Sequence, residues 1–165
     1  MKLSYKEIAD WQVFEDLVAA YFEAIPNDES NNITEVKVEP SGEGPDGGRD
    51  ILVNFRIDDS VQSFNRIWVI QCKFYENSVS KTHLANCNIP TLIHEYNADG
   101  YLLVCKSGVT AGVSNMFENL NKNCKMNYDY DFWAGTQFLQ KIMVAEDILA
   151  FYFPEYYHYL KRNSF

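Results

Sequence analysis

Three polar residues whose side chains can bind a metal or move a proton occur close together in the sequence. Asp50 follows the glycine-rich segment 41–49, and Gln71 and Lys73 close an apolar stretch further along the chain. Glycine adopts backbone angles that other residues avoid, so this segment can turn sharply and deliver Asp50 to the start of a strand over 50–55. Side chains alternate between the two faces of a strand, and Gln71 and Lys73 therefore share one face of the next strand.

The polar end of this second strand suggests a binding site. Two polar side chains at the end of an apolar, doubly buried strand are costly unless partners or a ligand satisfy them. An Asp that opens one strand, facing an amide oxygen and a Lys on its neighbour, can hold a divalent cation and place an ammonium beside it. Taken alone, Gln71 and Lys73 also fit a strand end that reaches solvent; Asp50 and the sequence around it favour a site.

A fourth candidate lies on the predicted first helix. Apolar residues recur at helical intervals from Ile8 to Phe22 until Pro26 ends the run, and residues 4–7 have the spacing of a capping box at its start. At 100° per residue, Glu15 falls inside the apolar arc of this helix. A carboxylate in that position needs a partner, which is either a buried Lys or Arg or a metal ion.

Beyond this helix the chain alternates between strand and helix patterns. Three sequential strands with short connections predict an antiparallel meander, and Pro90 predicts a kink or a break in the helix that contains it. Together these elements predict a mixed α and β domain. In chain order they are strands at 33–39, 50–55 and 66–74, a helix at 79–96, a strand at 101–105, a helix at 110–122, a strand at 126–132 and a last helix from Thr136.

The segment Gly44-Pro-Asp-Gly-Gly-Arg-Asp50, followed by Gln71-Cys-Lys73, resembles the Mrr-like branch of the PD-(D/E)XK nuclease superfamily, restriction-endonuclease-type domains that cut DNA. Phe14-Glu15 in the first helix and the segment 98–110 are similar to further parts of the family pattern, and residues 5–115 are covered best. The resemblance implies a restriction-endonuclease-like α/β fold. Its αβββαβ core has a central mixed sheet flanked by helices, and C-terminal helices follow.

The resemblance also implies a function: a Mg²⁺- or Mn²⁺-dependent deoxyribonuclease, an endonuclease that hydrolyses phosphodiesters as the effector of a restriction or antiphage defence system. Asp50, Gln71 and Glu15 would bind the metal, and Lys73 would orient or deprotonate water or neutralise the scissile phosphate. Gln71 stands where most of the superfamily has Glu or Asp, which makes Glu15 more necessary. Asp46 is either a turn residue or an accessory acid. The alternative function is a PD-(D/E)XK-like DNA-binding or assembly domain with weak catalysis.

Length and composition predict one domain. The chain has 165 residues, of which 47% are hydrophobic, so residues 1–165 can form a single nuclease domain, either complete or the N-terminal module of a longer protein. The four cysteines are scattered, which favours reduced thiols over a zinc site. No apolar run approaches the roughly 20 residues that span a bilayer, and the first residues lack the apolar core of a signal peptide. We therefore expect a cytoplasmic protein without membrane contact.

The charge distribution bears on the partners. A net charge of −9 argues against a nucleic-acid binder, but residues 1–50 hold 4 basic and 12 acidic side chains, whereas residues 51–165 hold 10 and 11. A DNA-binding face built from the later segment remains open. One site of this family cuts one strand, so the resemblance implies a homo-oligomer or clustering by a sensor domain or protein. The aromatic residues of 151–159 either form that contact or pack the last helix onto the sheet.

Overall fold

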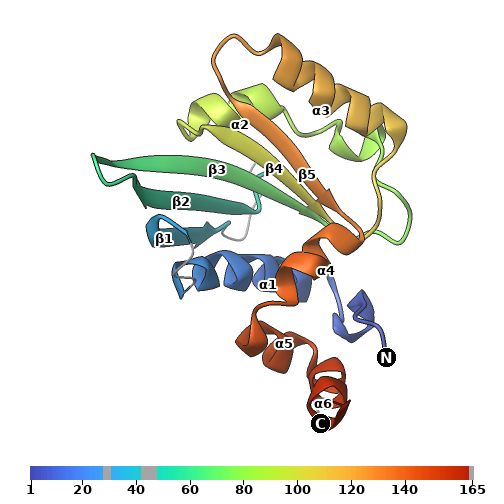
Figure 1. Cartoon of the computed structure of the whole chain (residues 1–165). Helices are drawn as coiled ribbons and strands as arrows, with labels where there is room; N and C mark the ends of the chain where they lie inside the picture. Colours follow the sequence, from blue (N-terminus) through green and yellow to red (C-terminus); the bar gives the residue numbers. More distant parts are fainter. Residues whose placement is uncertain (28–30, 42–47, 164–165) are drawn as a thin grey trace.

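The computed structural model describes residues 1–27, 31–41 and 48–163 of the chain (Figure 1). Asp46 and most of the predicted glycine turn therefore lie outside the described residues. Arg49 and Asp50, which connect this turn to the sheet, are described.

A five-stranded mixed sheet with the strand order β1-β2-β3-β4-β5 forms the centre of the fold (Figure 1). The first three strands form the predicted antiparallel meander, and β4 and β5 continue from β3 in parallel. This sheet confirms the predicted fold class. The strands are β1 (Ile33–Pro40), β2 (Ile51–Asp58), β3 (Ser63–Lys73), β4 (Gly100–Cys105) and β5 (Asp129–Ala134).

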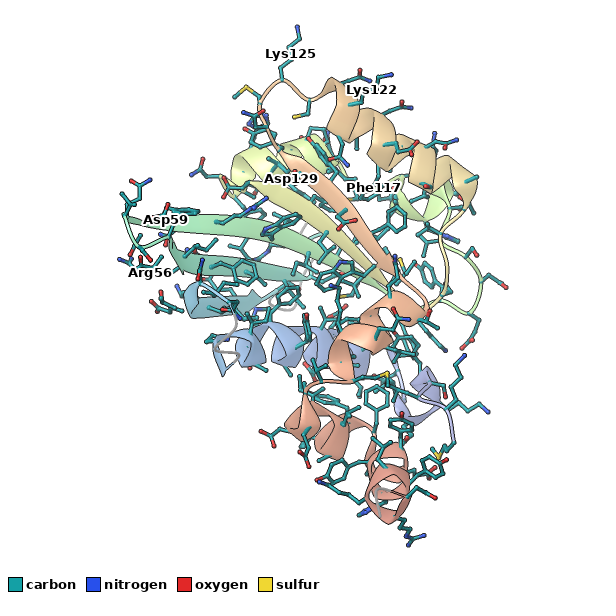
Figure 2. The ribbon with its side chains drawn as sticks, in the orientation of Figure 1. Arg56, Asp59, Phe117, Lys122, Lys125 and Asp129 are labelled. Carbon is teal, nitrogen blue, oxygen red and sulfur yellow. The ribbon has the colours of Figure 1, made fainter. Side chains whose placement is uncertain are left out.

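Helices cover both faces of this sheet (Figure 1). On one face α1 and the three C-terminal helices share a hydrophobic cluster with β2, β3 and β4, and on the other face α2 and α3 share a second cluster. Figure 2 shows Phe117 between α3 and the sheet, and Lys122 and Lys125 pointing away from it. The helices are α1 (Trp11–Ala24), α2 (Ile89–Glu95), α3 (Ala111–Asn123), α4 (Thr136–Ile142), α5 (Glu146–Tyr152) and α6 (Pro154–Asn163), with short 3₁₀ turns at Tyr5–Glu7, Ile25–Asn27 and Lys81–Leu84.

Burial explains why β3 and β4 lie in the centre of the sheet. Every residue of β4 is buried, as expected for a parallel strand that is covered on both faces. In β3, Ile70 and Cys72 belong to the cluster beneath α1, whereas Val69 belongs to the cluster beneath α2 and α3. The predicted alternation of side chains along this strand is therefore correct.

The prediction that α1 begins with a capping box at residues 4–7 is wrong. The helix begins after Asp10, whose carboxylate accepts a hydrogen bond from the Val13 amide at 3.0 Å. Glu7 instead accepts hydrogen bonds from the amides of Glu155 (2.7 Å) and Tyr156 (3.2 Å) in the first turn of α6. The acid that local spacing assigned to one helix therefore caps another at the far end of the chain.

Other boundaries also differ from the sequence pattern. Pro90 breaks the predicted 79–96 helix, as expected, and lies in the first turn of α2. The strand β5 begins at Asp129, three residues later than predicted, because Asn127 has a positive φ of 56° that interrupts the extended chain. Gly135, at φ 56°, precedes α4, and Thr136 is the first helical residue instead of the cap.

The C-terminal aromatic residues divide between the core and the surface. Phe153 and Tyr156 are buried in the cluster beneath α1, whereas the side chains of Phe151 and Tyr159 are 77% and 38% exposed. Much of the tail therefore packs onto its own core. Within the described ranges, no helix combines the length and the hydropathy needed to cross a membrane.

Candidate active site

Asp50 is held firmly at the start of β2. Its amide donates to the Ile70 carbonyl at 3.0 Å, and its carbonyl accepts from the Ser41 amide at 2.7 Å, so its backbone extends the sheet toward both neighbouring strands. Its carboxylate Oδ2 accepts from the Cys72 amide at 2.5 Å. The side chain thus accepts a hydrogen bond from an amide that lies beyond the last paired residues of β2 and β3. This bond fixes the position of the acid.

Three of the four predicted site residues line one pocket. Asp50, Glu15 from the second turn of α1, and Lys73 from the end of β3 surround a hollow of about 550 Å³. The sequence separates these residues widely, and the packing of α1 against β3 brings them together. The other residues that line the pocket are Asp10, Trp11, Cys72, Phe74 and Tyr75.

The pKa of Glu15 shows that the charged groups of this pocket lie close to one another. Partial burial, and next the negative charge of Asp50, raise the pKa of Glu15 to about 7, with a further contribution from Asp16 and an opposing one from Lys73. Glu15 and Asp50 therefore repel each other in this pocket, and the ammonium of Lys73 compensates their charges incompletely. A bound cation would relieve this repulsion.

A raised carboxyl pKa has a defined consequence for stability. The folded state binds the Glu15 proton more tightly than the unfolded state, so this contribution to stability is complete below about pH 4.5 and is lost as the pH rises through about 7. We expect the free energy of unfolding of the metal-free protein to fall more between pH 5 and pH 8 than that of Glu15→Gln. Urea denaturation in the presence of a chelator measures both. Glu23→Gln on the exposed side of α1 controls for the loss of one acid, and equal pH slopes for wild type and Glu15→Gln would contradict the assignment.

Lys73 reaches the pocket from the last position of β3. Its carbonyl accepts from the Lys106 amide at 3.0 Å, which ties this strand end to the residue after β4. Its Nζ lies 5.9 Å from the ring centroid of Tyr75, and the positive charge faces that aromatic ring. The ammonium is therefore positioned at the sheet end, beside the two acids.

Gln71 is placed differently from the other three residues. Its side chain is only 3% exposed, and it does not line the pocket wall. Its Oε1 accepts a hydrogen bond of 2.5 Å from the Tyr101 hydroxyl on β4. The oxygen of this amide is therefore hydrogen-bonded by the neighbouring strand β4.

Gly48 lies against the nitrogen of the Gln71 amide. It has a φ of +98°, and a Cβ at this position would lie 2.9 Å from Gln71 Nε2 and 3.0 Å from Cys87 Sγ. Real Cβ atoms essentially never approach other atoms so closely, and L side chains rarely adopt this φ. Both the space and the backbone angle therefore require glycine here.

We expect Gly48→Ala to destabilise the protein by about 1–3 kcal/mol, because the new methyl group meets the buried amide and the backbone is strained. Gly112→Ala is the matched control. Gly112 lies in α3, where a Cβ would make ordinary contacts of 3.7–3.9 Å, and alanine favours a helix over glycine by roughly 0.5–1 kcal/mol. Chemical denaturation of the two variants separates these effects. A Gly48→Ala protein as stable as Gly112→Ala would contradict the close packing.

Sequence reasoning missed the partners of the predicted residues. Tyr101 reads as one more apolar position of a buried strand, and no local signal identifies Gln71 as its acceptor. Helical periodicity groups Trp11 with the core, yet its side chain is 57% exposed at the edge of the pocket. An aromatic residue at a helix start next to the acid-bearing turn was the available signal for Trp11.

The donor set fits a hard divalent cation. The described residues contain no group of three His, Cys, Asp or Glu side chains that could hold a metal, but Asp50 and Glu15 supply two carboxylates in one pocket. Mg²⁺ is usually held by one or two carboxylates, with water and substrate phosphates completing its coordination. The amide oxygen of Gln71 has a second lone pair beside the one that Tyr101 occupies.

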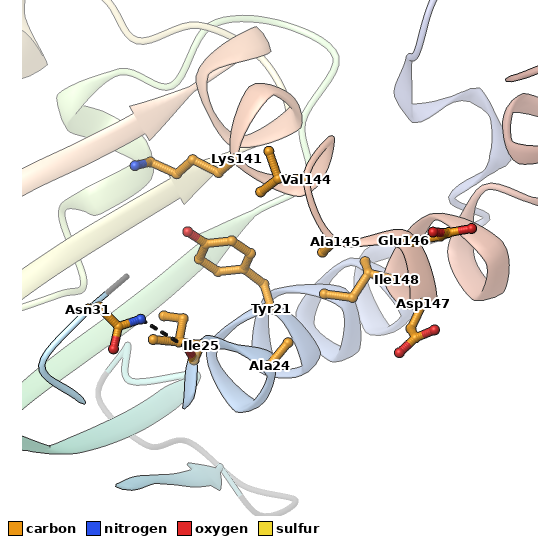
Figure 3. A pocket seen from close by; sticks show the side chains of 10 residues that line it. All are labelled: Tyr21, Ala24, Ile25, Asn31, Lys141, Val144, Ala145, Glu146, Asp147 and Ile148. Carbon is orange, nitrogen blue, oxygen red and sulfur yellow. Dashed lines mark hydrogen bonds between the residues drawn. The ribbon is translucent and has the colours of Figure 1, made fainter. Parts of the chain in front are cut away.

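A second hollow, of about 630 Å³, lies between the end of α1 and the connection from α4 to α5 (Figure 3). Asn31 Nδ2 donates to the Ile25 carbonyl at its edge. Lys141, Glu146 and Asp147 are its charged residues, and none of the predicted site residues lines it. The candidate active site is therefore the pocket that contains Asp50.

Comparisons with known proteins agree with this geometry. The family model Mrr_cat, described as restriction endonuclease, matches residues 7–140. Two solved structures are similar: the MspJI restriction endonuclease in complex with a 27-mer oligonucleotide (16% identity, 78% of this chain, TM-score 0.52) and the DNA modification-dependent restriction endonuclease AspBHI (17% identity, 86% of this chain, TM-score 0.57). At these identities the likeness shows the fold. The chain spans 27% and 32% of the length of these two proteins.

None of the curated proteins compared with the chain matches it. The family match covers most of the chain and includes every predicted site residue. It also agrees with the fold of the two solved structures. By this match, the chain belongs to the Mrr_cat restriction endonuclease family.

Proposed function

We propose that this chain is a divalent-metal-dependent endonuclease that hydrolyses phosphodiester bonds in DNA. The observation that carries the proposal is the pocket in which Glu15, Asp50 and Lys73 meet at the end of β3. Family membership supports the nuclease activity and the DNA substrate. Mg²⁺ is the cofactor that we propose, with Mn²⁺ as a substitute, because both accept carboxylate and amide oxygens.

Asp50 and Glu15 would hold the cation, and Gln71 would offer its amide oxygen as a third ligand. When bound, the cation would neutralise charge on the phosphate and make a water more acidic. The hydrogen bond from the Cys72 amide keeps the Asp50 carboxylate in a fixed orientation, which lowers the cost of assembling the site. Glu15 must lose its proton to bind a cation, so metal affinity should increase as the pH rises through about 7.

Lys73 is the proposed acid–base and phosphate-binding residue. Its ammonium carries three N–H donors and lies in the same pocket as the two acids. From there it can donate to a phosphate oxygen or to the attacking water, and it supplies positive charge where the transition state gains negative charge. The same pocket thus contains the anionic groups that bind a cation and the cationic group that binds the substrate.

The DNA strand would continue past Lys73 along residues 74–76. A neighbouring hollow of about 490 Å³ shares Phe74 and Tyr75 with the active-site pocket and is lined by Lys6 and Lys106. Lys106 forms an ion pair with Glu76 and lies 4.3 Å from the ring centroid of Phe74. These two lysines offer a next phosphate contact on a protein that is acidic as a whole.

We expect Lys106→Ala to weaken DNA binding and to reduce the salt dependence of the binding constant by about 0.9 in log–log slope, the value for one phosphate contact on duplex DNA. Fluorescence anisotropy with Ca²⁺ in place of Mg²⁺ measures binding at several salt concentrations. Lys122→Ala is the control, because Lys122 lies in the last turn of α3 and points away from the sheet (Figure 2). Equal slopes for wild type and Lys106→Ala would remove this lysine from the DNA path.

A plasmid assay tests the proposed function. Supercoiled DNA should be nicked or linearised in Mg²⁺ or Mn²⁺ and should stay intact with a chelator. Because one site cuts one strand, the assay should include a version fused to a dimeric coiled coil, which supplies a second site nearby. Intact DNA in both versions and both metals, with DNA binding retained, would favour the binding or assembly domain instead.

We further propose that cleavage of both strands requires two copies, either through self-association or through a sensor that clusters the domains. In this proposal residues 1–165 act as one effector module of a cytoplasmic restriction or defence system. Of the aromatic residues at 151–159, Phe151 and Tyr159 are exposed and available for a contact, whereas Phe153 and Tyr156 are buried in the core of their own chain. Light scattering across protein concentrations tests self-association, and a monomer at high micromolar concentration would assign the clustering to a partner.

A further inference from the structure

Tyr101 and Gln71 form a buried polar pair between neighbouring strands. The side chain of Tyr101 is fully buried, and its hydroxyl lies 2.5 Å from Gln71 Oε1. The phenol is the donor of this hydrogen bond. Gln71 directly precedes Cys72, whose amide donates to the Asp50 carboxylate, so the pair lies one residue from the strand position that holds the active-site acid.

The two ends of the Gln71 amide have different neighbours. Oε1 meets the Tyr101 hydroxyl, and Nε2 lies under Gly48, 2.9 Å from the position that a Cβ would occupy. The oxygen and the nitrogen of an amide are similar in size, but only the oxygen can bind a cation. A carboxylate at this position would bind equally well through either oxygen and would need no such orientation.

We propose that Tyr101 is a positioning residue that sets the orientation of the Gln71 amide, so that its oxygen remains on the side of the cation. This inference rests on the proposed metal-dependent function. Tyr101 itself touches neither metal nor substrate. By donating to one lone pair of Oε1, it stabilises the orientation that keeps the NH₂ group beside Gly48. In this proposal the second lone pair of Oε1 then serves the cation. A glutamine at this position therefore depends on a donor that a glutamate would not need.

A purely structural role makes a different prediction. Any buried amide oxygen that loses its donor destabilises the fold, so reduced stability of Tyr101→Phe does not distinguish the two roles. The distinguishing quantity is metal affinity in the folded protein, and specifically whether the effect of Tyr101 on that affinity requires the amide. A double-mutant cycle between Tyr101 and Gln71 isolates this coupling.

Isothermal titration calorimetry with Mn²⁺, without DNA, measures the four proteins of the cycle: wild type, Tyr101→Phe, Gln71→Ala and the double variant. We expect Tyr101→Phe to weaken Mn²⁺ binding by about 10-fold or more, the size of effect typical for residues that orient metal ligands. In the Gln71→Ala background it should have no further effect. Tyr130→Phe is the matched control, because Tyr130 pairs with Tyr101 in register on β5 but directs its hydroxyl to Cys124. We expect its affinity to equal that of wild type.

The outcomes distinguish a failure of this inference from a failure of the proposed metal-dependent function. Absence of Mn²⁺ binding by the wild type would overturn the proposed metal site. Wild-type affinity in Tyr101→Phe, or an equal loss in the Gln71→Ala background, would overturn the role of Tyr101 alone. If Tyr101→Phe does not fold, the Mn²⁺ affinity of the double variant can still be compared with that of Gln71→Ala. The double variant leaves no amide oxygen unmatched, and a further loss of affinity in it would contradict the proposal.

Discussion

Asp50→Asn should reduce metal-dependent DNA cleavage by about 10³-fold or more while the protein remains folded. Asparagine can still accept the hydrogen bond from the Cys72 amide, so the sheet should keep its geometry. It removes the negative charge that we assign to metal binding, and the pocket retains the carboxylates of Glu15 and Asp10 beside Lys73. The loss should therefore arise from chemistry instead of unfolding.

The measurement is the single-turnover rate of plasmid nicking in Mn²⁺, with thermal unfolding of each protein recorded in parallel. Glu23→Gln is the control, since Glu23 is an exposed acid on α1 and this substitution removes the same charge outside the pocket. We expect it to cleave at nearly the wild-type rate. Activity of Asp50→Asn within tenfold of wild type would place the metal elsewhere.

Lys73→Met should lower the cleavage rate by about 10²–10⁴-fold, the range for loss of a residue that transfers a proton or stabilises charge. Methionine is similar in length and removes the ammonium. DNA binding should decrease much less than the rate, because Lys6 and Lys106 remain in the neighbouring hollow. This split between rate and binding is the signature of a group that acts in the transition state.

The rate of Lys73→Met at saturating DNA, together with its binding constant measured in Ca²⁺, tests this prediction. Lys73→Arg helps to separate the two proposed roles. Arginine keeps a positive charge near the phosphate but does not lose its proton, so it should restore activity if Lys73 neutralises charge and fail if Lys73 deprotonates water. A rate that falls only as much as DNA binding would contradict a catalytic role.

The face on which each candidate site residue lies could be predicted, because it depends on the local sequence of its own strand or helix. Alternation along β3 assigns Gln71 and Lys73 to one face, and a glycine at φ +98° just before Asp50 allows the turn that delivers it to the sheet. Helical periodicity assigns Glu15 to the inner side of α1. Each conclusion depends on a few consecutive residues. The pocket contains Asp50, Glu15 and Lys73, whereas Gln71 lies outside its lining.

The contacts between distant segments could not be predicted in this way. Tyr101 reaches Gln71 because β3 and β4 pair in parallel with one particular register, which neither strand encodes alone. Glu7 caps α6 across nearly the whole chain, and no local spacing indicates this contact. The start of β5 depends on the positive φ of Asn127, a conformation that asparagine tolerates but does not require.

The most direct test of the central claim is the anomalous scattering of Mn²⁺ in crystals of the metal-free protein soaked with this ion. We predict a peak in the pocket between the carboxylates of Asp50 and Glu15, with Gln71 Oε1 turned toward it and Lys73 beside it. Absence of a peak there at millimolar Mn²⁺, or a peak bound by other residues, would contradict the assignment of this pocket as the metal-dependent active site.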